Sequence, residues 1–236
     1  MGILLKPKDY IEYLISTQIN YTCTNLSHHK QTFSHDAVSD FLSHSKMSSQ
    51  DLWNIVDPHL EESDNAMIID DDSVQDKRYS RFIELVKRQY SGNTKSIVQG
   101  IGWVNMVYWT GNEGAFYPMD SRIYHPETDN QTKHDHFQEM FMDLINNKQL
   151  KVHQLTFDSW YASCANLKLS HRAGWTFFTL LKKNRLVSRS KTSGYQSISE
   201  LEFSEQELPT GIQVKLNKVP FWVKVFKIVS PDGNID

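Results

Sequence analysis

The chain has 236 residues, of which 39% are hydrophobic and 12% aromatic, which is enough apolar material for a substantial core. No segment approaches the roughly 20 consecutive apolar residues of a membrane span, and the short apolar run near the N-terminus has no cleavage site of a secretory signal after it. The two cysteines, Cys23 and Cys164, are too few and too far apart for a disulfide framework or a cysteine-based zinc site. We therefore expect a soluble cytoplasmic protein.

The net charge of −3 is unevenly distributed. Residues 1–72 hold 4 Lys and Arg against 12 Asp and Glu, a balance of −8, whereas residues 73–236 hold 21 against 16, a balance of +5. The densest cationic run consists of Lys182, Lys183, Arg185, Arg189 and Lys191. Such a run matches a phosphate backbone, although the solvated end of a strand explains it equally well.

The first 65 residues predict short helices. Capping residues and apolar spacing place these helices at Asp9–Ile15, His35–Ser43 and Leu52–Val56. The last two, joined by Lys46-Met47-Ser48, have the arrangement of a helix-turn-helix. The acidity of this region instead favours a helical cap on the following domain.

Residues 66–186 predict a mixture of strands and helices. The expected strands are Met67–Ile69, Ile97–Thr110, Ala115–Tyr124, Val152–Phe157 and Trp175–Leu181, on the basis of β-branched and aromatic residues between turns. The expected helices are Thr132–Asn146 and Ser163–Ala173. The resulting order, β-β-β-α-β-α-β, is that of an α/β fold with a ribonuclease-H-like core.

Residues 187–236 alternate polar and apolar side chains and predict two or three antiparallel strands. Turns are expected at Pro209-Thr210-Gly211 and Pro231-Asp232-Gly233-Asn234. The expected organisation is thus a helical N-terminal region over residues 1–65, a catalytic core over residues 66–186 and a β-rich region over residues 187–236, the first being a candidate for DNA binding.

Two acidic residues are expected where neighbouring strands end. Asp71 lies in a triple-Asp cluster after the first core strand, and Asp158 follows the fourth. Carboxylates that converge in this way favour Mg²⁺, which can activate a nucleophile for phosphodiester chemistry. An N-terminal helix cap explains Asp158 alone, and a solvated turn explains the three aspartates alone.

Three segments resemble motifs of the DDE superfamily of insertion-sequence transposases, namely Ile68–Lys77, Leu155–Ala162 and Phe177–Arg185. The resemblance implies that Asp71 and Asp158 are catalytic and bind Mg²⁺ or Mn²⁺, with Asp72 as the alternative first ligand. It also implies that Lys182, Lys183 and Arg185 follow double-stranded DNA at the element ends, and that the protein acts as a homodimer in cut-and-paste transposition. Lys133 and His134 are further candidate DNA contacts.

The family pattern contains a third acidic residue, a Glu on a helix that follows a β-rich insertion. This chain ends inside the expected insertion, and its nearby glutamates lie in polar turn or strand sequence: Glu200, Glu202, Glu205 and Glu207. We therefore expect an incomplete active site and an inactive fragment. A DNA-binding remnant without catalysis is the alternative.

Met67–Val74 also fits the motif of haloacid-dehalogenase-type phosphatases, in which Asp70 would be the nucleophile and Asp72 the acid or base. That fold requires a helix, not a strand, between about Ser96 and Tyr124. The histidine pairs His28-His29 and His134-Asp135-His136 are expected to be surface or capping residues rather than metal ligands. Four tryptophans are expected in the core: Trp103, Trp109, Trp160 and Trp175.

Overall fold

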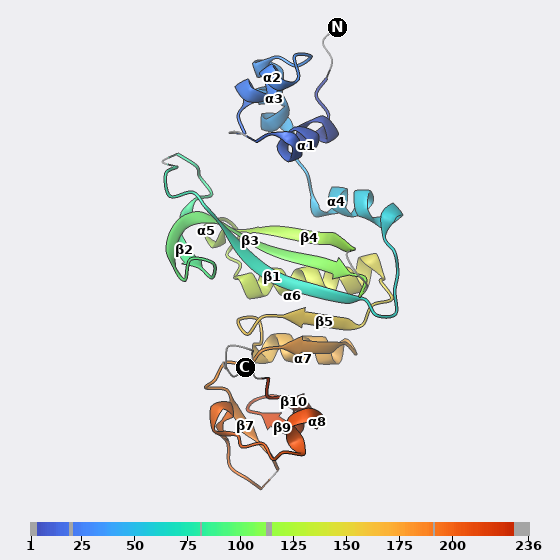
Figure 1. Cartoon of the computed structure of the whole chain (residues 1–236), viewed down its shortest axis with the longest axis vertical. Helices are drawn as coiled ribbons and strands as arrows, with labels where there is room; N and C mark the ends of the chain where they lie inside the picture. The colour runs from blue at the N-terminus through green and yellow to red at the C-terminus, as the bar shows by residue number, and fades with distance from the viewer. Residues whose placement is uncertain (1–3, 19–20, 81, 112–114, 191, 229–236) are drawn as a thin grey trace. The chain divides into compact units, whose positions relative to one another are not determined.

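The structure is a computed structural model that describes residues 4–18, 21–80, 82–111, 115–190 and 192–228. The chain forms two compact units, Met1–Ser48 and Ser49–Asp236 (Figure 1). Across the described ranges, no helix combines the length and apolar character that a membrane crossing requires.

The first unit is a small helical bundle with its own core. Its helices are α1 (Pro7–Ser16), α2 (Cys23–His29) and α3 (His35–His44). The core consists of Leu5, Tyr13, Leu26, Phe33 and Val38. Helices α1 and α3 confirm the sequence prediction. Helix α2 was not predicted because Leu26 is its only buried residue, so its sequence has no apolar period.

Helix α4 (Ser49–Val56) begins the second unit and is followed by the short 3-10 helix η1 (Asp57–His59). Val56 is buried in the main core, and α4 contacts strand β4 (Phe116–Tyr124). Helices α3 and α4, the pair that resembled a helix-turn-helix in sequence, therefore belong to different compact units. The behaviour of α4 agrees with the expectation that part of the N-terminal region caps the next domain.

The second unit is built on a six-stranded mixed sheet (Figure 1). Its remaining strands are β1 (Met67–Asp76), β2 (Lys87–Ser91), β3 (Ser96–Trp109), β5 (Gln154–Phe157) and β6 (Thr176–Thr179). The strand order is β2-β3-β1-β5-β6, and β4 pairs with β3. Strand β3 is antiparallel to β1, β2 and β4, whereas β1, β5 and β6 are parallel.

All five strands predicted for this region are present, but the structure adds two features. Strand β1 continues to Asp76, well beyond the predicted end at Ile69, and β2 was not predicted. Both stretches are rich in polar residues and lack the apolar alternation that identifies a half-buried strand. They are strands because β3 is long enough, from Ser96 to Trp109, to pair with both of them.

Helices cover one face of this sheet. They are α5 (Pro126–Asp129), α6 (Lys133–Asp143), its π-helical continuation η2 (Leu144–Lys148) and α7 (Cys164–Arg172). Helix α6 packs on β3 and β4, and α7 packs on β6. Val104, Met106 and Tyr108 of β3 are buried, whereas the alternate residues Trp103 and Asn105 are half-buried. The face that carries Trp103 and Asn105 is called the open face below.

The C-terminal part of the second unit forms a separate antiparallel sheet in the order β10-β9-β7-β8. Its strands are β7 (Leu186–Ser188), β8 (Gln196–Ser197), β9 (Ile212–Leu216) and β10 (Trp222–Val225), with the short helices η3 (Ile198–Glu200) and α8 (Glu207–Thr210) between them. This confirms an antiparallel β-rich region, with one strand more than the two or three predicted. The expected turn at Pro209–Gly211 is the end of α8, where Gly211 has a φ of 68°. The turn expected at Pro231–Asn234 lies outside the described residues.

Helix α6 brings Lys133 and His134 to the sheet, and a reciprocal capping box fixes its start. The hydroxyl of Thr132 accepts a hydrogen bond from the amide of Asp135 at 3.2 Å, and the Asp135 carboxylate accepts one from the amide of Thr132 at 2.8 Å. We expect Thr132→Ala to lower the free energy of unfolding by about 1 kcal/mol. Thr132→Ser should retain most of the stability, because it keeps the capping oxygen.

Urea unfolding followed by tryptophan fluorescence measures this effect in the second unit alone, since all six tryptophans lie after residue 48. Equal destabilisation by Thr132→Ala and Thr132→Ser would show that the lost methyl group, not the cap, is responsible.

Candidate functional site

Three consecutive aspartates lie inside β1 rather than at its end, so their side chains alternate between the two faces of the sheet. Asp70 pairs with Met106 of β3 and is buried on the helix-covered face, and Asp72 points to the same side. Asp71 pairs with Asn105 and is exposed on the open face. Asp71 and Asp72, the two alternatives that the sequence left for the first metal ligand, therefore lie on opposite faces of the sheet.

Asp158 directly follows β5, the parallel neighbour of β1. Asp70 is the register partner of Phe157, so Asp71 and Asp158 occupy the next positions of the two chains. One oxygen of Asp158, Oδ1, accepts hydrogen bonds from the amides of Trp160 at 2.7 Å and Tyr161 at 3.3 Å. Asp158 thus holds a turn, while the cap of α7 is Ser163. The other oxygen, Oδ2, accepts no hydrogen bond from the described residues.

Asp70 is a buried carboxylate without a partner. Its side chain is only 1% exposed, and within the described ranges neither of its oxygens accepts a hydrogen bond. Burial raises the pKa of Asp70 well above its ordinary value, and the charges of Asp71, Asp72 and Asp158 add to that shift. An unpaired buried carboxylate is destabilising, and such groups are concentrated at functional sites.

The hydroxyl of Tyr161 is a second unpaired group beside the aspartates. It is buried and has no hydrogen-bond partner in the described part of the chain. Burial raises the pKa of Tyr161, and the largest charge contribution after burial comes from Asp70. The buried Asp70 and Tyr161 therefore interact electrostatically with each other and with Asp71, Asp72 and Asp158. A bound cation or proton would stabilise this arrangement.

Lys133 at the start of α6 supplies the positive charge closest to this cluster. Its ammonium group forms an ion pair with Asp72 and lies 5.4 Å from the centre of the Tyr124 ring. Partial enclosure raises the pKa of Asp71, while Lys133 and the amide of Asp72 act in the opposite direction.

The donor set fits Mg²⁺ chemically, since it consists of hard carboxylate oxygens, two of them unpaired on Asp70. In this conformation, however, no three His, Cys, Asp or Glu residues among those described are spaced to hold one ion. Asp72 could join a metal site only if Lys133 moved away from it.

The phosphatase hypothesis is contradicted by the fold. It required a helix between about Ser96 and Tyr124, but that segment forms the antiparallel strands β3 and β4. Its nucleophile would be Asp70, which is buried on the helix-covered face and inaccessible to a substrate.

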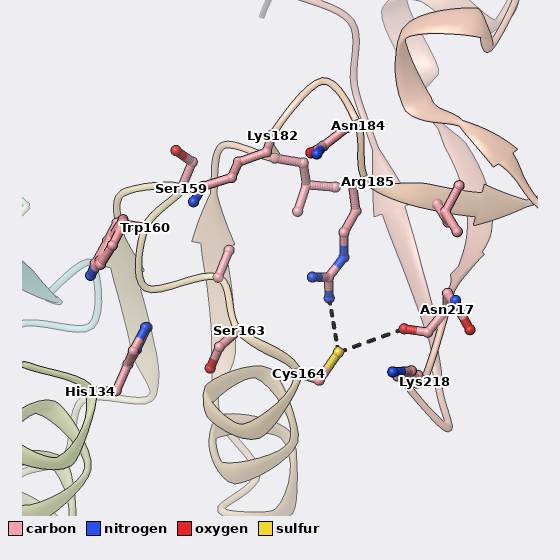
Figure 2. A pocket seen from close by; sticks show the side chains of 13 residues that line it. His134, Ser159, Trp160, Ser163, Cys164, Lys182, Asn184, Arg185, Asn217 and Lys218 are labelled. Atoms are coloured by element: carbon pink, nitrogen blue, oxygen red, sulfur yellow. Dashed lines mark hydrogen bonds between the residues drawn. The ribbon is translucent and has the colours of Figure 1, made fainter. Parts of the chain in front are cut away.

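A cleft of about 500 Å³ has Ser159 and Trp160, the residues that follow Asp158, in its wall (Figure 2). It is lined by the start of α6, the loop between β5 and α7, the segment after β6 and the turn between β9 and β10. Trp160 is 53% exposed there, so the expectation that it belongs to the core is wrong. The ring of His134 stacks on Trp160 with 6.1 Å between centroids, and the ammonium of Lys182 lies 4.8 Å from the Trp160 ring centre.

Of the other three tryptophans expected in the core, only Trp175 is buried, whereas Trp103 and Trp109 are half-buried on the open face.

Burial lowers the pKa of His134, with Lys182 acting in the same direction and Asp135 opposing it. His134 is therefore a neutral ring near pH 7, so it can stack on Trp160 without repelling Lys182.

The cations predicted to follow DNA do not act as one group. Lys182 and Arg185 line the cleft, whereas Lys183 is exposed outside it. Arg185 donates a hydrogen bond to the sulfur of Cys164 at 3.4 Å. Arg189 pairs with Glu207 at 2.8 Å, which removes it from the free cationic run, and Lys191 lies outside the described residues.

Two of the four C-terminal glutamates have local roles. The amide of Ser204 and the neighbouring Arg189 lower the pKa of Glu207 to about 2. Glu200 accepts a hydrogen bond from the amide of Ser197 at 3.3 Å and caps η3.

Sequence reasoning missed Asp70 and Tyr161 as members of the acidic region. The signal for Asp70 was its two-residue spacing from Ile68 in a strand, which places both side chains on the buried face.

Comparison with known proteins adds no identification, because no protein-family model matches the chain and no curated protein has significant sequence similarity to it.

Proposed function

We propose that this chain is the ribonuclease-H-like part of a DDE-type transposase, an enzyme class that cleaves and joins DNA with divalent metal ions. The proposal is supported by the strand order β4-β3-β1-β5-β6, in which the first three strands are antiparallel and the last three parallel. The observation that carries it is the adjacency of Asp71 in β1 and Asp158 directly after β5, beside the buried Asp70, whose carboxylate has no partner among the described residues.

In this proposal Asp71 and Asp158 hold Mg²⁺ or Mn²⁺, while Asp72, on the other face of β1, stays paired with Lys133. When bound there, such an ion would supply the activation of a water molecule or a 3′-hydroxyl and the stabilisation of the leaving oxygen of a phosphodiester. A cation at these ligands would oppose the raised pKa of Asp70, and Asp70, once ionised, would add negative charge beneath them. Dimerisation on paired DNA ends belongs to the same proposal.

The cleft supplies the DNA contacts in this proposal. Lys182 and Arg185 offer positive charge to phosphate groups, and the exposed Trp160 offers an aromatic surface to a base or sugar. The turn held by Asp158 also positions Trp160, since the carboxylate accepts the Trp160 amide. Metal ligand and DNA contact are thus parts of one loop.

A second candidate function is DNA binding without cleavage. It is favoured by the Lys133–Asp72 ion pair and by the engagement of Glu207 with Arg189. Incubating the chain with end-labelled duplex DNA and Mn²⁺ separates the two functions. Strand cleavage that Asp71→Asn abolishes would support the enzyme, and duplex binding without any cleavage would support the binder.

The metal site itself is tested by titrating Mn²⁺ into the full chain and measuring the concentration of free Mn²⁺ by electron paramagnetic resonance. We expect Asp71→Asn and Asp158→Asn each to weaken binding about tenfold or more, which corresponds to about 1.4 kcal/mol per factor of ten. Asp64→Asn is the matched control, because Asp64 is an exposed carboxylate of the same unit. Unchanged Mn²⁺ affinity in both site variants would reject the assignment of these ligands.

A further inference from the structure

A strongly cationic segment lies between β1 and β3, outside the site described above. We call residues 77–97 the ribbon; it contains β2 and the start of β3. The ribbon has a single acid, Glu84, and six cations: Lys77, Arg78, Arg81, Lys87, Arg88 and Lys95. The net charge of the ribbon is therefore +5, whereas the net charge of the whole chain is −3. This contrast indicates a local attraction for a polyanion.

The ribbon also exposes aromatic rings. Phe82 is 97% exposed, Tyr79 is 91% exposed and Tyr90 is 61% exposed. None of the three belongs to either hydrophobic core cluster of the described residues. Aromatic rings interleaved with cations are typical of surfaces that bind nucleic acids, where the rings contact bases or sugars and the cations contact phosphates.

Two ribbon cations are available for a partner. Arg88 and Lys95 are exposed, and neither forms an ion pair with any described residue. Other cations of the ribbon have structural roles: Arg78 pairs with Asp76, and Lys87 lies 4.1 Å from the centre of the Tyr124 ring. Burial lowers the pKa of Lys87, in keeping with a role inside the protein.

The exposed face of the ribbon continues the open face that carries Asp71. Arg88 pairs with Gln99 of β3, and Asp71 pairs with Asn105, which is on the same face of β3 as Gln99. Six strand positions separate Gln99 from Asn105, which is about 20 Å at a rise of about 3.3 Å per residue. A duplex with a rise of about 3.4 Å per base pair would cover this distance with about six base pairs.

We propose that the ribbon is an arm that binds the backbone of double-stranded DNA about six base pairs from the phosphodiester held near Asp71. The position relative to Asp71 rests on the proposed function, whereas the affinity of the ribbon for a duplex does not. Arg88 and Lys95 contact phosphates in this arrangement, and Tyr79, Phe82 and Tyr90 pack against the sugars and groove edges.

The test is fluorescence anisotropy of a labelled 30-base-pair duplex titrated with the full chain in EDTA at several NaCl concentrations. We expect Arg88→Gln/Lys95→Gln to weaken binding about tenfold or more at low salt and to reduce the slope of log affinity against log salt by about 1.8. Arg172→Gln/Lys224→Gln removes the same charge from exposed positions of the second unit outside the ribbon and the cleft, and should change affinity less than about twofold.

Equal weakening by both double variants would overturn the proposal, because it would show a general charge effect. Unchanged binding by the ribbon variant would also overturn it, as would tighter binding of a single strand of the same length. Tyr79→Ser/Phe82→Ser should weaken binding severalfold without changing the tryptophan-monitored unfolding, since both rings are almost fully exposed. A loss of folding in this variant would contradict the assignment of these rings to the surface.

The experiments can reject the metal site at Asp71 and Asp158 and the DNA-binding ribbon independently of each other. Metal is absent from the binding experiment, so Asp71→Asn and Asp158→Asn should bind the duplex as well as the unmodified chain or better. The ribbon variant should in turn bind Mn²⁺ normally. Loss of Mn²⁺ binding in the ribbon variant would indicate misfolding and overturn the assignment of Arg88 and Lys95 to a separate surface.

Discussion

Asp70→Asn is expected to stabilise the protein at neutral pH by about 1–3 kcal/mol, because it replaces a buried and unpaired ionisable group by a neutral one of the same shape. The pKa of Asp70 is raised in the folded state, so the folded chain holds this proton at a pH where the unfolded chain has released it. Stability therefore falls as pH rises from the ordinary pKa of an aspartate towards the raised pKa of Asp70. The asparagine variant lacks this contribution to the pH dependence.

The measurement is thermal unfolding of both proteins at several values between pH 4 and pH 8. The advantage of the variant should be small near pH 4 and should grow with pH, reaching about 2–12 °C for a unit of this size. Asp64→Asn, on the exposed surface, should follow the unmodified chain throughout. A variant that is less stable than the unmodified chain at pH 8 would show that Asp70 has a stabilising partner.

A divalent ion should reduce the difference in stability between Asp70→Asn and the unmodified chain. Binding to the folded chain alone raises its stability, so Mn²⁺ should stabilise the unmodified chain more than Asp70→Asn, in which the charge beneath the ligands is gone. A residue that lowers stability in the absence of a ligand is expected at a functional site, where the arrangement of charges serves binding rather than folding.

Phe141→Ala is expected to have the largest effect on stability, about 3–5 kcal/mol. Phe141 is completely buried on α6, where its ring meets Trp175 edge-on at 5.0 Å and stacks on Phe137 at 5.9 Å. Removing the ring leaves a cavity between α6 and the sheet, because the neighbouring aromatic rings cannot collapse fully into the space.

The neighbouring Met142→Ala serves as the control, since Met142 is 37% exposed on the same helix and should cost less than about 1 kcal/mol. Urea unfolding followed by tryptophan fluorescence measures both variants, and it reports only on the second unit. Similar losses for Phe141→Ala and Met142→Ala would contradict the described packing of α6.

Much of the fold could be predicted because its elements have strong local signals. The apolar stripe of α6, the caps of α3 and α7 and the apolar runs of β3 and β5 are visible in short windows of sequence. Strand β2 and the second half of β1 could not be predicted in this way. Their polar residues form strands only because β3 offers them a hydrogen-bonding edge.

The same limit applies to the candidate site. The sequence singled out Asp71 and Asp158, since each lies beside an apolar strand, and it identified Lys182 and Arg185 by their charge. It did not show that Asp70 is the buried aspartate or that Trp160 is exposed. The first depends on which face of β1 the helices cover, and the second depends on the loop that Asp158 holds.

By itself, then, the sequence determined the types of the elements with strong apolar patterns, the acidic and cationic residues, and an order of strands and helices that admits a ribonuclease-H-like core. Only the tertiary structure decided the register of β1 against β5, which pairs Asp70 with Phe157 and so places Asp71 next to Asp158. It also decided the cleft, whose walls come from α6, the loop after β5 and the turn after β9. Local propensities act over a few residues, whereas these contacts join segments far apart in the chain and form only when the shared core is buried.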